Sequence, residues 1–318
     1  MSKPGGAKAI VAAMSANLAI AAMKFIAWLL TGAASLLAEA IHSTADSANQ
    51  ILMLLGRKSA QRQADELHPF GYGRDRYISA FLVAVILFSM GGLFALYEAF
   101  RKFQEVRAGH PDELLESRFW WVSLVVLVGA IAAESFSLRT ALAEAKPARG
   151  NLSLAAFIRQ SRAPELPVVL LEDMAALLGL VFALVGVSVS LATGSGYGDV
   201  IGSGLIGLLL VAVAIVLAVE IKSLLVGESA RPEQAAAIAR AIVGVPDISG
   251  LVYLKTLHIG PESVLVAAKI TAAPELDAVR LARAIDEAET AIRAAEPMVG
   301  PIFLEPDIWD GAKAGGPV

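Results

Sequence analysis

Six long apolar segments limit what this chain can fold into. A helix needs about 20 residues to cross the ~30 Å hydrocarbon core of a bilayer. Only 18% of the residues are charged, against about a quarter in ordinary soluble domains. We therefore expect an α-helical membrane protein whose six transmembrane helices lie in a lipid bilayer, at residues 10–30, 36–55, 78–97, 119–142, 166–191 and 200–219.

Lys and Arg residues predict the orientation of these segments. They are concentrated before the first segment, between the second and third, and between the fourth and fifth. Short loops rich in Lys and Arg stay in the cytoplasm. The loop at 98–118 also contains basic residues, which weakens this asymmetry without reversing it. We expect both termini to be cytoplasmic, and the compact length and lack of a transit peptide favour a bacterial inner membrane.

The pattern changes after residue 226 to that of a small α+β domain. Short runs with strand periodicity alternate with amphipathic segments and are separated by Gly-Pro and Pro-Glu turns. We expect two helices, at 232–243 and 275–295, to cover one face of a sheet with strands at 250–259, 263–272 and 301–309.

The chain is therefore predicted to have a transmembrane domain at 1–226, a cytoplasmic α+β domain at 227–310 and a disordered tail at 311–318. Acidic residues outnumber basic ones in the C-terminal part. This charge argues against a nucleic-acid partner.

Ionisable residues interrupt the apolar segments. Each costs at least about 2.5 kcal/mol near the middle of a bilayer, so a functional partner is expected. His42 and Asp46 share one helix face with Glu39, and a second acidic pair, Glu172 and Asp173, lies in the fifth segment. Imidazole and carboxylates are suitable ligands for a divalent ion such as zinc, whereas thiolate ligands are excluded because the chain has no cysteine.

Hydrogen bonding between helices is the competing explanation for each of these residues. Glu134, in the fourth segment, could support a metal site, relay protons or bond to another helix. Lys24, near the end of the first segment, is expected to extend its amine to the membrane interface. Ser203 and Gly207 are spaced for close helix packing.

Several motifs in a fixed order carry a family resemblance. They are LLAEAIHSTADSANQ, HPFGYGRDRY, EDMAALLG, GDVIGSGLIGLLL and LLVGES. With them the chain resembles the cation diffusion facilitator family of divalent metal transporters, and most closely the zinc transporter 9-like branch. The resemblance implies six transmembrane helices, a ferredoxin-like, metallochaperone-like cytoplasmic domain, a homodimer, and exchange of a divalent metal ion for protons.

The resemblance also assigns the transport site. It places metal ligands at His42, Asp46 and Asp173, but Val169 occupies the position where most members have a fourth ligand. Glu172 could supply that ligand, although adjacent helical residues point about 100° apart. Glu39, Asn49, Glu134 or water could also supply it. Zn²⁺ is the expected substrate, and the altered ligand set leaves room for Mn²⁺, Co²⁺ or Fe²⁺.

These ligand types predict a mechanism in which protons and metal compete. A bound ion requires neutral His42 and ionised carboxylates. After the ion leaves, burial favours protonated carboxylates, and His42 is the residue most suited to titrate near neutral pH. If the site opens alternately to each side, this competition couples metal export to proton import.

The remaining histidines are weaker candidates. His68 lies in a turn-forming context, where a structural role and a role in metal capture are both open, and Asp65 and Glu66 could attract cations nearby. His110 is expected in a solvated loop. His258, with Glu305 and Asp307, could form a regulatory metal site in the C-terminal domain, or these residues could simply be solvated.

Two further classes of function compete with transport. A membrane-embedded metalloenzyme would also use His and acidic ligands, but the sequence contains no HExxH motif. We expect a secondary active transporter and not an enzyme. The second competing class is a non-transporting regulatory scaffold, and Val169 is the residue that favours it.

Overall fold

The computed structural model describes residues 5–273 and 275–308, with side chains from residue 17 onward. The chain divides into two compact units. The first, the helical unit, comprises Met1–Gly56 and Ile78–Ile221, and the second, the sheet unit, comprises Arg57–Tyr77 and Lys222–Val318. The domain boundary at residue 226 remains a prediction, and the tail at 311–318 lies outside the described residues.

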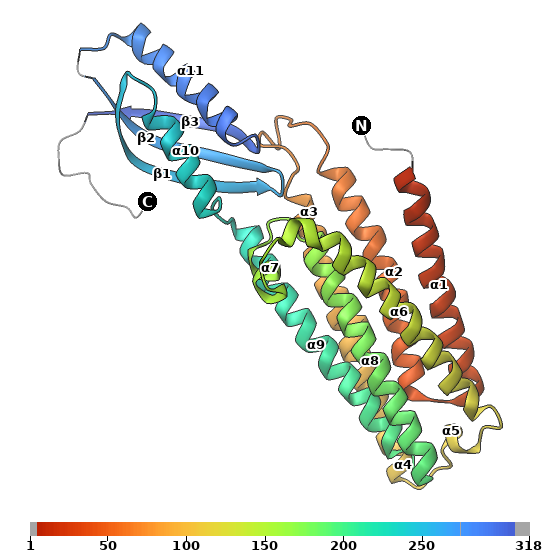
Figure 1. Cartoon of the computed structure of the whole chain (residues 1–318). Coiled ribbons are helices and arrows are strands. Elements are labelled where there is room, and N and C mark those ends of the chain that lie inside the picture. Colours follow the sequence, from red (N-terminus) through yellow and green to blue (C-terminus); the bar gives the residue numbers. More distant parts are fainter. Residues whose placement is uncertain (1–4, 274, 309–318) are drawn as a thin grey trace. The chain divides into compact units, whose positions relative to one another are not determined.

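Long helices make up the helical unit (Figure 1). A π-helical segment, η1, continues directly from α3 into α4, so these three form one continuous helix. The elements are α1 (Gly5–Thr31), α2 (Ala34–Ser59), α3 (Asp75–Ile86), η1 (Leu87–Leu93), α4 (Phe94–Arg107), α5 (Glu113–Glu116), α6 (Trp120–Arg149), α7 (Leu154–Gln160), α8 (Glu165–Thr193) and α9 (Tyr197–Val226).

Four helices in the described part of the chain are long and apolar enough to cross a membrane. They are Asp75–Arg107, Trp120–Arg149, Glu165–Thr193 and Tyr197–Val226. The apolar part of α1 within the described side chains, Asn17–Thr31, is shorter, and polar residues lower the hydropathy of α2. The prediction of a helical membrane protein is therefore confirmed, whereas the count of six spans remains a prediction.

Glycines allow close approach between helices of this unit. A Cβ on Gly186 of α8 would lie 2.8 Å from the carbonyl oxygen of Gly198 in α9. A Cβ on Gly207 of α9 would lie 2.8 Å from the backbone nitrogen of Leu96 in α4. Small residues permit such backbone contacts. The predicted close packing at Gly207 is confirmed, and these contacts fix how α8 and α9 are rotated.

The sheet unit contains three strands in the order β1-β2-β3 (Figure 1). β1 pairs antiparallel with β2, and β2 pairs parallel with β3 across the α11 connection. The elements are α10 (Pro232–Val243), β1 (Ile248–Gly260), β2 (Ser263–Ala272), α11 (Ala278–Ala295) and β3 (Val299–Asp307).

One face of this sheet forms the core with both helices. Alternate residues of β2 point into it, as the two-residue period of a strand requires. α10 contributes Ile238 and Ile242, and α11 contributes residues at helical spacing. The predicted packing of two helices on one face of a three-stranded sheet is confirmed. The buried side chains of β2 and α11 are Val264, Val266, Ala268, Ile270, Ala284, Ala288 and Ile292.

Candidate metal site

A buried polar stripe runs along α2. Glu39, His42, Asp46 and Asn49 are separated by three or four residues, so they lie on one helix face. Glu39, His42 and Asn49 are almost fully buried, and 16% of the Asp46 side chain is exposed. The sequence predicted this stripe, and in the structure it faces the interior of the helical unit.

His42 and Asp46 have a geometry suited to sharing one ion. His42 Nδ1 lies 3.6 Å from Asp46 Oδ1, which is too long for a hydrogen bond. Two ligands placed about 2.0 Å from a tetrahedral zinc ion would lie about 3.3 Å apart. Neither ring nitrogen of His42 nor Oδ1 of Asp46 has a hydrogen-bond partner within the described residues. These atoms could therefore bind one ion after a small adjustment.

α8 brings an acidic residue to the end of this stripe. Asn49 Nδ2 donates a hydrogen bond of 2.6 Å to Glu172 Oε1. At the other end of the stripe, a Cβ on Gly179 would lie 2.5 Å from Glu39 Oε1. The two helices therefore run antiparallel, with Glu172 opposite Asn49 and Gly179 opposite Glu39. Glu172 is 7% exposed, and its carboxylate lies on the α2 side of α8.

The neighbouring acid points elsewhere. Ser137 of α6 donates a hydrogen bond of 3.0 Å from Oγ to Asp173 Oδ2. Val169, four residues earlier on the same face, packs against an apolar cluster that includes Ala141 and Ala145 of α6. The face that carries Val169 and Asp173 therefore contacts α6, whereas Glu172 contacts α2.

Lys24 forms a buried ion pair with Glu39. Its Nζ lies 3.0 Å from Glu39 Oε2 and 2.7 Å from Ser43 Oγ, and neither charged side chain is exposed. The prediction that Lys24 extends to the interface is therefore wrong, because its amine has a carboxylate partner at its own depth. This pairing occupies one oxygen of Glu39 and makes Glu39 less suited to bind a metal.

Asp46 and Glu134 line the same small cavity. The cavity has a volume of about 10 Å³ and is also lined by Asn17, Ile20 and Ser43. About 10–15 Å³ is the least that holds one water molecule. Glu134 of α6 therefore faces Asp46 of α2 across a space of roughly that size, which suits either a bridging water or a proton relay.

The π-helical segment η1 lies beside His42. A Cβ on Gly91 would lie 3.9 Å from His42 Nδ1 and 3.2 Å from Leu210 of α9. A π-bulge inserts one residue into a helical turn and frequently occurs at functional sites. A side chain at this position would press on Leu210, whereas its distance from His42 would be an ordinary van der Waals contact.

These donors are arranged mainly as pairs. Within residues 5–273 and 275–308, no three His, Asp or Glu side chains converge closely enough to hold one ion. His42 with Asp46, and Glu172 with Asn49, are the two pairs closest to forming a site.

Residues 10–226 match the family described as the cation efflux transmembrane domain. The chain belongs to the cation diffusion facilitator family. It is 32% identical over 269 residues to the mitochondrial proton-coupled zinc antiporter SLC30A9 of Xenopus laevis, and 31% identical over 269 residues to that of Homo sapiens. Each of these alignments covers 84% of this chain and 46% of the relative.

A plant relative is similar over nearly the same region. The metal tolerance protein C4 of Arabidopsis thaliana is 28% identical over 265 residues, which are 83% of this chain and 56% of that protein. The chain therefore spans about half the length of these relatives. Membership of the cation diffusion facilitators and the resemblance to the zinc transporter 9-like branch are confirmed.

In this cation diffusion facilitator, His68 lies in a turn. Asp65 accepts a hydrogen bond of 2.7 Å from the backbone N–H of His68 and one of 2.5 Å from the hydroxyl of Tyr72. The ring centroids of His68 and Tyr72 are 4.4 Å apart. The Tyr72 hydroxyl and the His68 N–H lower the pKa of the Asp65 carboxyl. These contacts support the structural interpretation of His68, and metal capture remains a prediction.

The three residues considered for a regulatory metal site in the sheet unit do not lie together. His258 pairs with Val264, whereas Glu305 pairs with Lys269, five residues further along β2. At about 3.3 Å per residue, these positions are roughly 17 Å apart. Lys269 Nζ lies 3.1 Å from Glu305 and 3.4 Å from Asp307, and the hydrogen bond with Glu305 raises the pKa of Lys269. Both acids therefore serve Lys269, and the interpretation that joined them to His258 is wrong.

The sequence interpretation missed two buried partners. Lys24 and Glu39 are equally distant from the turn at Thr31 and Gly32, so two antiparallel helices place them at one depth. That symmetry could have predicted their pairing. Asp199, at the start of α9, accepts bonds from the first backbone N–H groups of α2 at 2.6 and 3.2 Å. No local sequence signal connects residues so far apart.

Proposed function

We propose that this protein is a secondary active transporter, and not an enzyme, that exports a divalent metal ion from the cytoplasm in exchange for protons. The family match supports transport of a metal cation. The names of the animal relatives, proton-coupled zinc antiporter, support Zn²⁺ as the substrate and protons as the coupling ion. The described donors, one imidazole with several carboxylates, are compatible with both.

The hydrogen bond between Asn49 and Glu172 is the observation that carries this proposal. It brings the acid of α8 next to the α2 stripe, within one helical turn of Asp46. We infer that His42, Asp46 and Glu172 bind the ion, and that Asn49 holds Glu172 in place when no ion is bound. Asp173 then supports α8 from the α6 side, through its bond to Ser137.

Coupling follows from competition for the same oxygens. Zinc binding needs His42 neutral and both carboxylates ionised. When the ion leaves, the buried carboxylates become costly as anions and take up protons. Glu134, which faces Asp46 across a small cavity, is placed to pass protons to it. The metal-bound form and the protonated form of the site then each favour opening to a different side of the membrane, which produces antiport.

The choice of metal rests on the number of oxygen ligands. One imidazole and two carboxylates suit zinc, with water or an amide oxygen in a fourth position. Recruitment of Asn49 or Glu134 would raise the coordination number and favour Mn²⁺, Co²⁺ or Fe²⁺. The pairing of Glu39 with Lys24 removes one further oxygen from the site and favours zinc.

We extend the proposal to the arrangement of the protein. The family resemblance implies six transmembrane helices with both termini in the cytoplasm. It also implies a ferredoxin-like sheet unit of the metallochaperone type and a homodimer. A bacterial inner membrane is the proposed location, although the animal relatives are named mitochondrial.

Zinc uptake into proteoliposomes with an imposed pH gradient tests the proposal. Wild type should accumulate zinc when the gradient is present and lose this uptake when an ionophore collapses it. Asp46→Asn should remove most of the flux. Asp247→Asn removes the same charge from the sheet unit, where Asp247 pairs with Arg280, and as the control it should retain the flux. A non-transporting scaffold, which Val169 and the paired arrangement of donors would favour, gives no flux in any variant.

A further inference from the structure

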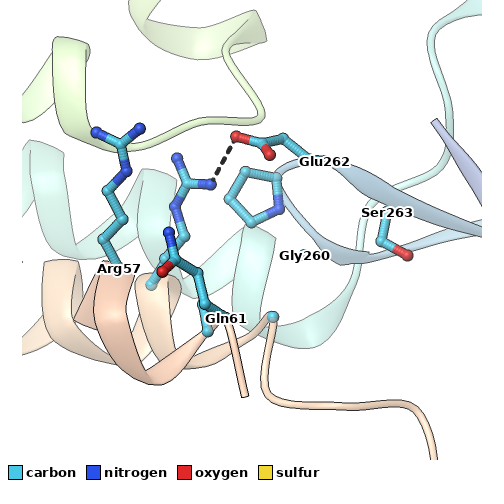
Figure 2. A pocket seen from close by; sticks show the side chains of 9 residues that line it. Arg57, Gln61, Gly260, Glu262 and Ser263 are labelled. Carbon is cyan, nitrogen blue, oxygen red and sulfur yellow. Dashed lines mark hydrogen bonds and ion pairs between the residues drawn. The ribbon is translucent and has the colours of Figure 1, made fainter. Parts of the chain in front are cut away.

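A pocket with several charged and polar side chains in its lining lies within the sheet unit, between residues 57–76 and the turn that joins β1 to β2. Its volume is about 170 Å³. Figure 2 shows Arg57 and Gln61 at one side and Glu262 facing them from the β1–β2 turn. The lining residues are Arg57, Ala60, Gln61, Gly73, Arg76, Gly260, Pro261, Glu262 and Ser263.

Two glycines form a close backbone contact at the wall of this pocket. A Cβ on Gly73 would lie 2.8 Å from the carbonyl oxygen of Ile259 and 3.0 Å from Gly260 Cα. A Cβ on Gly260 would lie 2.9 Å from Gly73 Cα. Any side chain at either position would push the loop away from the turn. The contact therefore fixes the loop against β1, so the pocket is part of the folded unit.

The pocket has an excess of positive charge. Arg57 lies in the last turn of α2, and Gln61 lies four residues later in the turn that follows this helix. Arg76 lies near the start of α3, and its Nη1 is 3.0 Å from Glu262 Oε1. The Arg76 side chain is 13% exposed and that of Glu262 is 79% exposed. A largely solvated carboxylate contributes little net stability to such a pair, so an anion of higher charge could replace it.

We propose that this pocket binds a phosphate group, with Arg57 and Arg76 as the principal contacts and Gln61 as an additional donor. Guanidinium groups bind phosphate oxygens through paired, charge-assisted hydrogen bonds. Glu262 holds the guanidinium of Arg76 in place until the phosphate replaces the carboxylate. Three donor side chains from two segments then converge on one anion.

The chain connectivity favours the headgroup of an anionic lipid over soluble phosphate. Arg57 follows directly on the part of α2 assigned to the helical unit, and Arg76 precedes Ile78, where that unit resumes. Both arginines therefore lie at the ends of helices that continue into the helical unit. Basic pockets between transmembrane helices on the cytoplasmic side bind anionic headgroups, and this choice of ligand rests on the cytoplasmic position proposed above for the loop. Free phosphate offers the same chemistry and is distinguished by the experiment.

The experiment uses the full-length protein in detergent micelles. Native mass spectrometry measures binding of phosphatidylglycerol and of phosphatidylcholine, and calorimetry measures binding of inorganic phosphate. The variants are Arg57→Gln, the double change Arg57→Gln with Arg76→Gln, and Glu262→Gln. Arg62→Gln is the matched control, because Arg62 lies in the same loop but contacts the ring of Tyr72, 4.0 Å from its centroid.

We expect wild type to bind phosphatidylglycerol more tightly than phosphatidylcholine. The double variant should lose about tenfold or more in affinity, as expected for the loss of charge-assisted contacts. Arg57→Gln should weaken the binding of phosphatidylglycerol severalfold. This variant tests the site independently of folding, because no ion pair or hydrogen bond of Arg57 is found in the described chain. Glu262→Gln should bind more tightly, and Arg62→Gln should remain within about twofold.

Three results would overturn or redirect the proposal. If inorganic phosphate binds with this variant pattern and phosphatidylglycerol does not, the site holds and its ligand is soluble. If Arg62→Gln weakens binding as much as Arg57→Gln, the loop attracts anions without a defined site and the proposal fails. It also fails if wild type binds none of the probes, or binds them no better than the double variant. These results are independent of metal transport.

Discussion

At the scale of single residues, the buried pair of Lys24 and Glu39 shows how charges are tolerated inside the helical unit. Both side chains are fully buried, and the amine also contacts Ser43 Oγ at 2.7 Å. An isolated charge in this environment is expensive, whereas a paired one is acceptable. One oxygen of Glu39 therefore neutralises Lys24, and its role as a metal ligand remains a prediction.

Removal of Lys24 should destabilise the protein strongly. Lys24→Met leaves Glu39 as an unpaired buried carboxylate, and breaking such a pair costs about 3–5 kcal/mol. The double variant Lys24→Met with Glu39→Gln should recover most of the loss, because both charges are absent. Thermal unfolding in detergent micelles measures the difference. A single variant as stable as wild type would show that the pair is not needed for stability.

Asp65 should show a measurable pH response in the loop after α2. Its folded-state pKa is lowered by the Tyr72 hydroxyl and the His68 N–H. Its contribution to stability is therefore present above the unfolded-state pKa and is lost as the pH falls through the lower folded value. Tyr72→Phe should move the Asp65 pKa upward, toward the ordinary value.

Carbon NMR of aspartate-labelled protein measures this titration, and Asp65→Asn assigns the signal. Tyr253→Phe, on β1, is the matched control and should leave the Asp65 titration unchanged. An unchanged titration in Tyr72→Phe would contradict the role given to the Tyr72 hydroxyl.

At the scale of helices, the rotation of α8 places Glu172 on the α2 side and Asp173 on the α6 side. Glu172 and Asp173 are adjacent, so they point about 100° apart and cannot both face α2. The sequence predicted that the fifth segment supplies an acid, but the choice depends on the contacts of Gly179 with Glu39 and of Gly186 with α9. Such contacts between distant segments have no local signature, so the sequence could not show which of the two acids faces α2.

The start of α2 depends on Asp199 of α9. Its carboxylate accepts bonds from the backbone N–H groups of Ala34 and Ser35 and from the Ser35 hydroxyl. These groups would otherwise lack partners at the start of the helix. Asp199→Ala should therefore destabilise the protein by about 2 kcal/mol, near the upper end of the range for helix caps.

Graded substitutions test this contact. Asp199→Asn retains one acceptor oxygen and should give an intermediate loss, and Ser35→Ala should give a smaller one. Unfolding in micelles measures all three variants. If Asp199→Ala unfolds at the same temperature as wild type, the carboxylate does not stabilise the start of α2.

At the scale of the whole molecule, regular patterns were easier to predict than individual contacts. Hydropathy identified the helical part, and strand and helix periodicity placed the elements of the sheet unit to within about three residues of their observed bounds. The buried stripe on α2 was also predictable, since helical spacing places its members on one face. The close association of the loop at Arg57–Tyr77 with the sheet was not predicted, because it depends on backbone contact at Gly73 and Gly260.

The central claim is that metal crosses at the face between α2 and α8 and that Glu172 completes the site there. The most direct measurement is pH-driven zinc uptake into proteoliposomes by Glu172→Gln and by Asp173→Asn, two adjacent residues that lose the same charge. If Glu172 binds the ion, loss of its charged contact should cost about 1.5–3 kcal/mol of binding free energy. The affinity of the site for zinc would then be roughly ten- to hundredfold weaker. We predict that Glu172→Gln loses most of the flux at limiting zinc and Asp173→Asn retains most of it. The opposite result would contradict this claim and place the site on the α6 side of α8.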